Sequence, residues 1–191
     1  MELSLPYIYI MKKILSLLLI LTPFLIQAQQ SQIEWISVEE AAELMKNEPR
    51  KIMMDVYTEW CGPCKMMMKN TFSNADVISF VNANYYAVKF NAESPDPIQF
   101  KNQPFENPDY DPARKGRNGV HQFARYMRVN AYPTIVYLDE DLNFLTGDAG
   151  YKTATQIELM LKFFAQDVYK KVSTQEEWDA YQTNFKPSFK E

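Results

Sequence analysis

The sequence is poor in the residues that bind metals or build cross-linked scaffolds, with two cysteines and one histidine in 191 residues. A closed structural zinc site needs four such ligands and a disulfide-rich scaffold needs several cysteine pairs, so neither is expected. No glycine-rich nucleotide-binding fingerprint occurs. The 24 Asp and Glu residues outnumber the 20 Lys and Arg residues, so the chain has no excess of positive charge. We therefore expect no metal, no bound cofactor and no nucleic-acid partner.

Apolar residues are plentiful, and one apolar run near the N-terminus has the pattern of a secretory signal. Lys12 and Lys13 form a short basic segment, residues 14–21 form the apolar one, and Ala28 offers a small residue for cleavage. The run is shorter than the roughly 20 residues that span a membrane. We predict a signal peptide over residues 1–28 and export to the periplasm or the extracellular space. The alternatives are an uncleaved anchor and a true start at Met11.

Hydrophobic spacing predicts a mixed α/β domain over residues 29–172. Short apolar runs are expected as strands at residues 51–57, 85–90, 134–138 and 144–147. Apolar residues at helical spacing predict helices at residues 38–47, 65–70, 74–81, 120–129 and 154–169. A strand–helix–strand start followed by a hairpin and a closing helix indicates a central mixed sheet with helices on both faces.

Two further segments add to this domain. Residues 92–120 hold five of the eleven prolines and are interpreted as a long surface insertion rather than a core element. The insertion either selects a partner or covers a sheet edge. His121 borders it and is expected at the surface of a helix start, not as a catalytic base. A capping box from Ser173 to Glu176 predicts a C-terminal helical extension over residues 173–191.

Cys61 and Cys64 stand three positions apart at the predicted start of a helix. Free backbone N–H groups and the helix dipole favour a thiolate at Cys61, and Pro63 suits an early helical position. Cys64 is expected to be more buried, one turn further on. Cys61 would attack a substrate disulfide and Cys64 would resolve the mixed disulfide. A purely structural disulfide would close too small a loop to add much stability, and a metal site would lack further ligands.

The segment WCGPCK at residues 60–65 resembles the active-site motif of thioredoxins, and three other positions agree. Asp55 stands in the strand before the motif, where thioredoxins carry a buried acid. Lys89 stands in the next strand, where they carry a lysine, and residues 132–134 (YPT) resemble their cis-proline loop. The resemblance covers residues 35–172 and implies a thioredoxin-like fold. The insertion and the C-terminal extension depart from the minimal pattern and leave substrate choice open.

The resemblance also gives roles to residues around the cysteines. Burying a charged carboxylate is costly, so the pKa of Asp55 is expected to be raised, and Asp55 would relay the proton of Cys64 with Lys89 modulating it. The alternative is a structural Asp55–Lys89 pair. A cis bond is expected before Pro133, with the Tyr132 backbone pairing with an extended substrate strand. The remaining substrate-binding residues are expected to be Trp60, Gly62 and Pro63.

The residues between the cysteines bear on the direction of electron flow. Gly62 and Pro63 add no positive charge beside Cys61, which favours a reducing potential. The resemblance therefore implies a reductase of protein disulfides outside the cytoplasm. It would take electrons from a membrane-bound donor, since the chain has no nucleotide site of its own. The alternatives are a disulfide oxidase or isomerase and a non-catalytic binding module.

Overall fold

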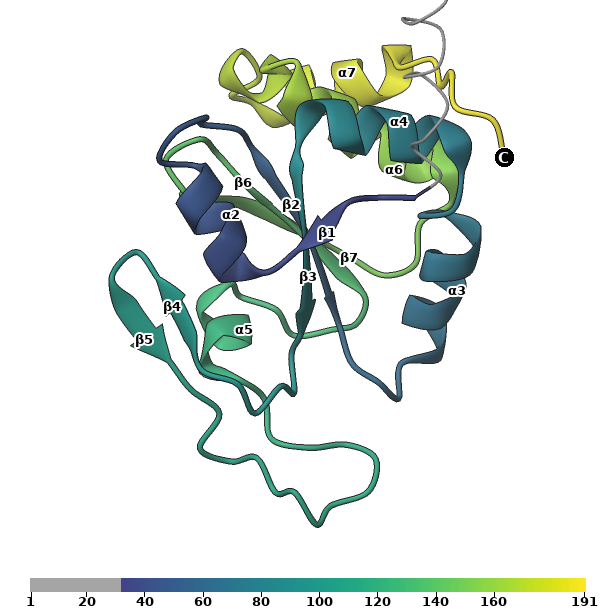
Figure 1. Cartoon of the computed structure of the whole chain (residues 1–191). Helices are drawn as coiled ribbons and strands as arrows, with labels where there is room; N and C mark the ends of the chain where they lie inside the picture. Colours follow the sequence, from purple (N-terminus) through teal and green to yellow (C-terminus); the bar gives the residue numbers. More distant parts are fainter. Residues whose placement is uncertain (1–31) are drawn as a thin grey trace, which may run out of the picture. The chain divides into compact units, whose positions relative to one another are not determined.

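The computed structural model describes residues 32–191, and the predicted signal peptide over residues 1–28 lies outside this range. The centre of the described part is a five-stranded sheet in the order β1-β3-β2-β6-β7 (Figure 1). Its strands are Trp35–Ile36 (β1), Ile52–Tyr57 (β2), Tyr86–Asn91 (β3), Thr134–Leu138 (β6) and Phe144–Ala149 (β7). β1 and β2 run parallel to β3, whereas β6 runs antiparallel to β2 and β7. The mixed sheet predicted from the sequence is confirmed.

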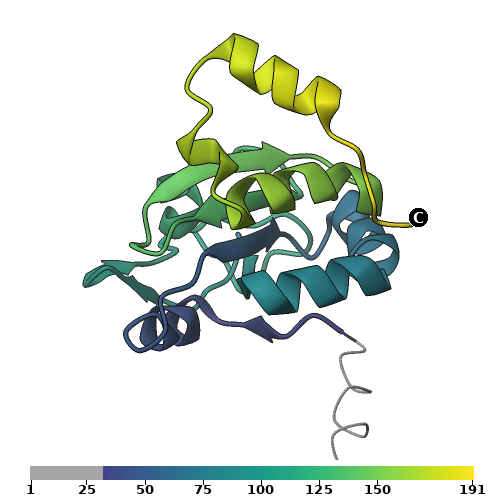
Figure 2. The same ribbon diagram turned by 90° about the horizontal axis from the view of Figure 1, so that it is seen from above.

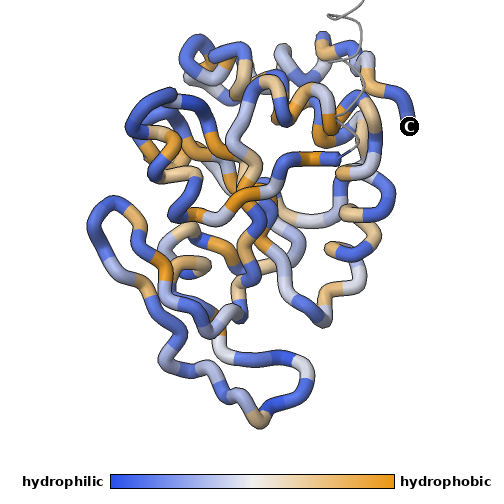
Figure 3. Tube along the Cα trace, in the orientation of Figure 1, coloured by the Kyte–Doolittle hydropathy of each residue, from blue (hydrophilic) through white to orange (hydrophobic). Residues whose placement is uncertain are grey.

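Helices cover both faces of this sheet because side chains alternate along its strands. Met53 of β2 packs on the face covered by α3, α4 and α6, whereas Ile52, Met54 and Val56 pack toward α2 and α5. The helices are Val38–Leu44 (α2), Gly62–Asn70 (α3), Ala75–Asn84 (α4), Gln122–Tyr126 (α5), Ala154–Ala165 (α6) and Gln175–Asn184 (α7), with a 3-10 turn at Val168–Lys170. Figure 3 shows the apolar residues concentrated along the central strands.

Several boundaries differ from the predictions by a few residues, and two other differences have a clear reason. β1 is absent from the predictions because two residues are too few to show a period. α3 begins at Gly62, so Pro63 takes the early helical position that the sequence indicates. The last capping box is formed by Thr174 and Glu177, one position after the predicted pair, because Thr174 takes the N-cap position of α7.

The interpretation of residues 92–120 as a surface insertion is wrong for the first half of the segment. This half forms a hairpin of Ile98–Phe100 (β4) and Gln103–Phe105 (β5). Ile98, Phe100 and Phe105 are buried and pack with Phe123 of α5 in the core on that face of the sheet. Three large apolar side chains in one hairpin provide enough surface to join the core despite the neighbouring prolines.

His121 does begin a helix, but the expectation that it lies at the surface is wrong. The side chain is fully buried as the N-cap of α5, and its Nδ1 accepts a hydrogen bond from the backbone N–H of Phe123. Its Nε2 lies 3.1 Å from the carbonyl oxygen of Asp96, so the proton sits on Nε2. Burial lowers the pKa of His121. The histidine therefore ties the insertion to α5 as a neutral ring.

The C-terminal extension folds back and completes the core beside α6. Figure 2 shows α7 outside α6, with the last residues returning toward it. The buried Glu158 carboxylate of α6 accepts hydrogen bonds from the backbone N–H groups of Ser188 and Phe189, each at 2.9 Å. Lys162 Nζ lies 2.5 Å from the same carboxylate. Phe189 itself is buried against the core. The extension is thus docked by a buried charge as well as by apolar packing.

Replacing Glu158 by glutamine is expected to lower the free energy of unfolding by about 2–4 kcal/mol at pH 7, because an amide cannot accept all of these hydrogen bonds. Burial alone would raise the pKa of Glu158, but the hydrogen bonds from Lys162, Ser188 and Phe189 outweigh it and hold the pKa below its usual value. The extra stability of wild type is therefore present above the unfolded pKa of about 4.5 and is lost as pH falls through the folded pKa.

Urea unfolding of wild type and Glu158→Gln at pH 7 and at pH 3 measures this difference. The matched control is Glu176→Gln, which removes an exposed acid from α7. An equal loss of stability in both variants, or a loss that is the same at both pH values, would contradict the docking role of Glu158.

Candidate functional site

The two cysteines form a disulfide at the N-terminus of α3. The bond joins Cys61 and Cys64 with an S–S distance of 2.01 Å and a Cα–Cα distance of 5.3 Å. Cys61 is the N-cap of the helix, and its Sγ accepts a hydrogen bond from the backbone N–H of Cys64 at 3.1 Å. Pro63 occupies the first turn, where its missing N–H group costs no hydrogen bond. The backbone N–H of Cys64 and the positive end of the helix dipole would therefore stabilise a negative charge on Cys61 Sγ.

The expectation that Cys64 is more deeply buried than Cys61 is wrong. Cys61 is 2% exposed and Cys64 is 3% exposed. The disulfide directs each sulfur at the other, so both side chains lose surface. The neighbouring Gly62 and Pro63 are exposed. A substrate must therefore reach Cys61 along the surface formed by these neighbours.

Asp55 lies in the middle of β2, buried to 1% exposure, on the same face of the sheet as Met53. That face packs against α3 through Met67, so Asp55 lies beneath the helix that carries Cys64. Burial raises the pKa of Asp55 from 3.8 to about 7, and the charge of Lys89 lowers it only in part. Asp55 Oδ1 receives no hydrogen bond from the described residues. The raised pKa that the sequence predicts is confirmed.

Lys89 lies beside Asp55 in the sheet without forming an ion pair with it. The two residues are partners in the parallel register of β2 and β3, so their side chains share a face. Lys89 Nζ instead lies 4.8 Å from the ring centroid of Tyr57, and no ion pair of Lys89 occurs within residues 32–191. The structural Asp55–Lys89 pair is therefore not formed, and Lys89 acts on Asp55 through its charge alone.

The loop before β6 meets the start of α3. The peptide bond between Tyr132 and Pro133 is cis, as the resemblance implies. The Tyr132 ring lies edge-to-face against Trp60, with 5.9 Å between ring centroids. Thr134, the next residue, pairs with Val56 at the end of β2 that leads into the disulfide segment. The proline loop and the tryptophan of the cysteine motif therefore gather at one end of the sheet.

Two residues of the insertion also join this site, and sequence reasoning missed both. The indole N–H of Trp60 is shared between the two carboxylate oxygens of Glu93, each 3.0 Å away. The guanidinium of Arg117 lies over the Trp60 ring, 4.4 Å from its centroid. The buried carboxylate of Glu93 thus holds the edge of the Trp60 ring, and the exposed Arg117 covers its face. No spacing rule links these residues, so the sequence carries no signal for the contact.

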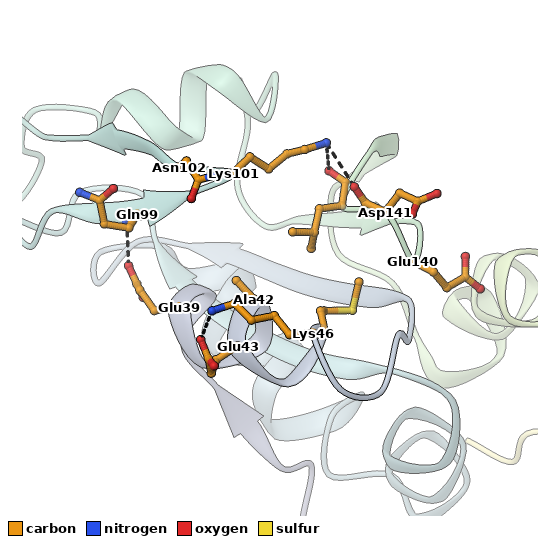
Figure 4. Close-up of a pocket in the computed structure, with 11 residues that line it drawn as sticks. Glu39, Ala42, Glu43, Lys46, Gln99, Lys101, Asn102, Glu140 and Asp141 are labelled. Atoms are coloured by element: carbon orange, nitrogen blue, oxygen red, sulfur yellow. Dashed lines mark hydrogen bonds and ion pairs between the residues drawn. The ribbon is translucent and has the colours of Figure 1, made fainter.

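One sizeable cavity lies away from the disulfide. It measures about 620 Å³ and is formed by α2, the β4–β5 hairpin and the β6–β7 turn (Figure 4). Some of its polar groups are already engaged, as Glu43 pairs with Lys46 at 2.5 Å and Glu39 accepts a hydrogen bond from the backbone N–H of Gln99. No predicted site residue lines it. The cavity therefore takes no part in the disulfide chemistry.

The comparison with protein families assigns residues 38–165 to a thioredoxin-like domain. The chain belongs to the thioredoxin-like family. Its fold and its CxxC disulfide are those of a thioredoxin-like disulfide oxidoreductase. Within the described residues, no group of three or more His, Cys, Asp or Glu side chains is placed to hold a metal ion. The same part of the chain has no helix long and apolar enough to cross a membrane.

Solved structures share this thioredoxin-like fold at low sequence identity. A thioredoxin from Thermus thermophilus is 18% identical with a TM-score of 0.52, over 70% of this chain and 87% of that one. A thioredoxin-fold protein from Helicobacter pylori is 13% identical with a TM-score of 0.56, over 82% of this chain and 91% of that one. These identities show the fold alone. The search of curated proteins found no match.

Proposed function

We propose that this thioredoxin-like protein reduces protein disulfides outside the cytoplasm through the Cys61/Cys64 dithiol. The observation that carries the proposal is the disulfide at the N-terminus of α3, in which Cys61 Sγ already accepts the backbone N–H of Cys64. The same N–H group and the helix dipole would stabilise a thiolate on Cys61 after reduction. A reactive thiolate and a second thiol one turn away are what disulfide exchange requires.

The reaction proceeds in two exchanges that balance in electrons. The Cys61 thiolate attacks one sulfur of the substrate disulfide, forms a mixed disulfide and releases the other substrate sulfur as a thiolate, which takes up a proton. Cys64, once deprotonated, attacks Cys61 Sγ, closes the Cys61–Cys64 disulfide and releases the second substrate thiolate. Two electrons pass from the dithiol to the substrate. The protein is left in the oxidised form that the structure shows.

Asp55 supplies a base for the second exchange. Its carboxylate lies beneath the helix that carries Cys64, and Asp55 Oδ1 is free of hydrogen bonds from the described residues. A pKa of about 7 lets the group exchange protons near neutral pH. Asp55 would take the proton of the Cys64 thiol as it attacks, and Lys89 would limit the rise in the pKa of Asp55 through its positive charge.

The surface around the disulfide suits an extended polypeptide. Trp60 and Tyr132 form an aromatic wall, and Gly62 and Pro63 next to Cys61 are exposed and can meet the substrate. The backbone at Tyr132, before the cis bond to Pro133, would pair with the substrate strand beside its cystine. Protein disulfides are therefore the substrates that this site fits best.

Repeated turnover needs a source of electrons outside the protein. The signal pattern over residues 1–28 supports export, and disulfides persist in exported compartments. No nucleotide fingerprint is found in the sequence, so a membrane-bound dithiol donor is the partner that we propose. The donor would reduce Cys61–Cys64 by the reverse of the two exchanges.

Redox titration of the purified protein against defined thiol–disulfide buffers, combined with an insulin-reduction assay, tests the proposal. The expected potential lies nearer the about −270 mV of thioredoxin than the about −120 mV of a strong disulfide oxidase, since Gly62 and Pro63 carry no charge. A potential near about −120 mV would support an oxidase or isomerase instead. A protein that never cycles between dithiol and disulfide would be a binding module, and the proposal would fail.

A further inference from the structure

The second half of the insertion forms a loop with a basic tip. The tip, residues 112–118, carries three cations and no acid, although the whole chain has a net charge of −4. The cations are Arg114, Lys115 and Arg117, and all three are exposed. Figure 1 shows this loop, between β5 and α5, projecting from the end of the sheet at which β2 leads into α3. These three cations therefore lie at the end of the fold that carries the disulfide, while the acids Asp109 and Asp111 lie at the base of the loop.

Hydrogen bonds at the base of the loop fix its path. The side-chain amide of Asn107 donates to the carbonyl oxygens of Ser94 and Gly119 at 3.0 and 2.8 Å. Asn118 accepts from the backbone N–H of Asp111 and donates to the carbonyl oxygen of Asp111. A Cβ atom at position 119 would lie 2.4 Å from the backbone of Asp109, so only glycine fits at this position. These contacts hold the loop in a defined conformation.

Arg117 connects this tip to the cysteine motif. Its guanidinium lies 4.4 Å from the centroid of the Trp60 ring, and Trp60 directly precedes Cys61. Arg117 forms no ion pair in the described part of the chain, whereas Arg114 lies 4.0 Å from Asp111. A guanidinium stacked on a ring keeps its in-plane N–H groups free to bind a carboxylate in a bidentate manner.

We propose that Arg117 and the basic tip form a docking surface for acidic polypeptide segments that flank the cystine to be reduced. The proposal rests on the proposed function, because the substrate is positioned for exchange at Cys61. Cys61 is only 2% exposed, so a substrate chain must pass its neighbours, and one of them is the ring that Arg117 covers. An aspartate or glutamate near the substrate cystine finds a free guanidinium there, whereas a lysine or arginine meets like charge.

Two disulfide-containing peptides that differ only in the residues beside the cystine test this surface, one with Asp and Glu and the other with Lys and Arg. The expected kcat/KM of wild type is about two- to fivefold higher for the acidic peptide at low salt, because the contact is an exposed charge pair. The preference is expected to vanish at about 0.5 M salt, where such pairs are screened. Arg117→Gln is expected to bring the ratio to about one, and Arg117→Glu to invert it.

Arg128→Gln is the matched control. Arg128 also lies over an aromatic ring, 4.9 Å from the centroid of Phe144, and its replacement changes the net charge by the same amount. Phe144 pairs with Leu138, at the end of β6 remote from Pro133. The control is expected to keep the preference for the acidic peptide. A wild type without preference, or an equal loss in Arg117→Gln and Arg128→Gln, overturns the docking surface.

The redox titration separates this inference from the proposed function. If neither peptide is reduced and the dithiol does not form, the proposed function fails. If both peptides are reduced equally well by wild type, reduction stands and the docking surface is refuted. If Arg117→Gln shifts the redox potential and slows both peptides by the same factor, Arg117 adjusts the potential of the disulfide and does not select substrates.

Discussion

A Cys61→Ser variant is expected to reduce insulin at least about 1,000-fold more slowly than wild type, because serine cannot supply the attacking thiolate. The variant should fold normally, since Cys61 and Ser differ by one atom and the bond that is lost closes a loop of only a few residues. Insulin turnover at a fixed concentration of dithiothreitol measures the loss, with the spontaneous rate subtracted.

A Cys64→Ser variant is the matched partner of this experiment. It keeps the attacking thiol and lacks the resolving one, so it is expected to accumulate as a covalent mixed disulfide with its substrate. Non-reducing electrophoresis of intact cells that express it would reveal the adducts, and mass spectrometry would name the substrates. Equal amounts of adduct in both variants would refute the assignment of Cys61 as the attacking sulfur.

An Asp55→Asn variant is expected to slow resolution of the mixed disulfide by about 100-fold, the contribution typical of a positioned general base. Wild type should resolve faster as pH rises through about 7, the pKa of Asp55, because the carboxylate must be unprotonated to accept the proton of Cys64. The variant should lose this inflection, since an amide does not titrate. Stopped-flow measurement of substrate thiol release from pH 5 to 9 follows both effects. An unchanged rate and pH profile would leave Asp55 as a structural acid.

Asp55→Asn slows resolution, but it is expected to raise the free energy of unfolding at neutral and higher pH. The folded pKa of Asp55 is raised above its unfolded value of 3.8, so the contribution of Asp55 to stability is fully present below about pH 4 and is lost as pH rises through about 7. The loss amounts to about 4 kcal/mol at high pH by linkage. Asp55→Asn is therefore expected to be more stable than wild type at pH 8 and similar to it at pH 4. Asp141→Asn, at an exposed turn, is the control that should show neither change.

Much of the site follows from the sequence because its parts have local signatures. The motif at residues 60–65 combines a proline with two cysteines at a helix start, and capping chemistry alone places Cys61 before the first turn. Asp55 is marked by its position inside an apolar strand, which makes burial and a raised pKa predictable. The central strands follow from short apolar runs of five or six residues.

Other features depend on contacts that no local pattern encodes. Glu93 and Arg117 reach Trp60 only because the insertion folds back over the start of α3, and their spacing from the motif is arbitrary. The burial of Phe100 was missed because nearby prolines indicate a loop, although the hairpin side chains pack on α5. Lys89 lies over the Tyr57 ring instead of pairing with Asp55, a choice that the sequence pattern does not encode. These outcomes are decided by tertiary packing.

The docking of residues 188–190 sets a limit on how the protein can be shortened. The matched family region ends at residue 165, yet Phe189 fills part of the core and Glu158 is satisfied by backbone groups of Ser188 and Phe189. A fragment cut at residue 172 would remove Phe189 from the core and take the backbone N–H groups of Ser188 and Phe189 from Glu158, which would keep Lys162 as its partner. The smallest autonomous unit therefore reaches beyond the family boundary and includes residues 188–190.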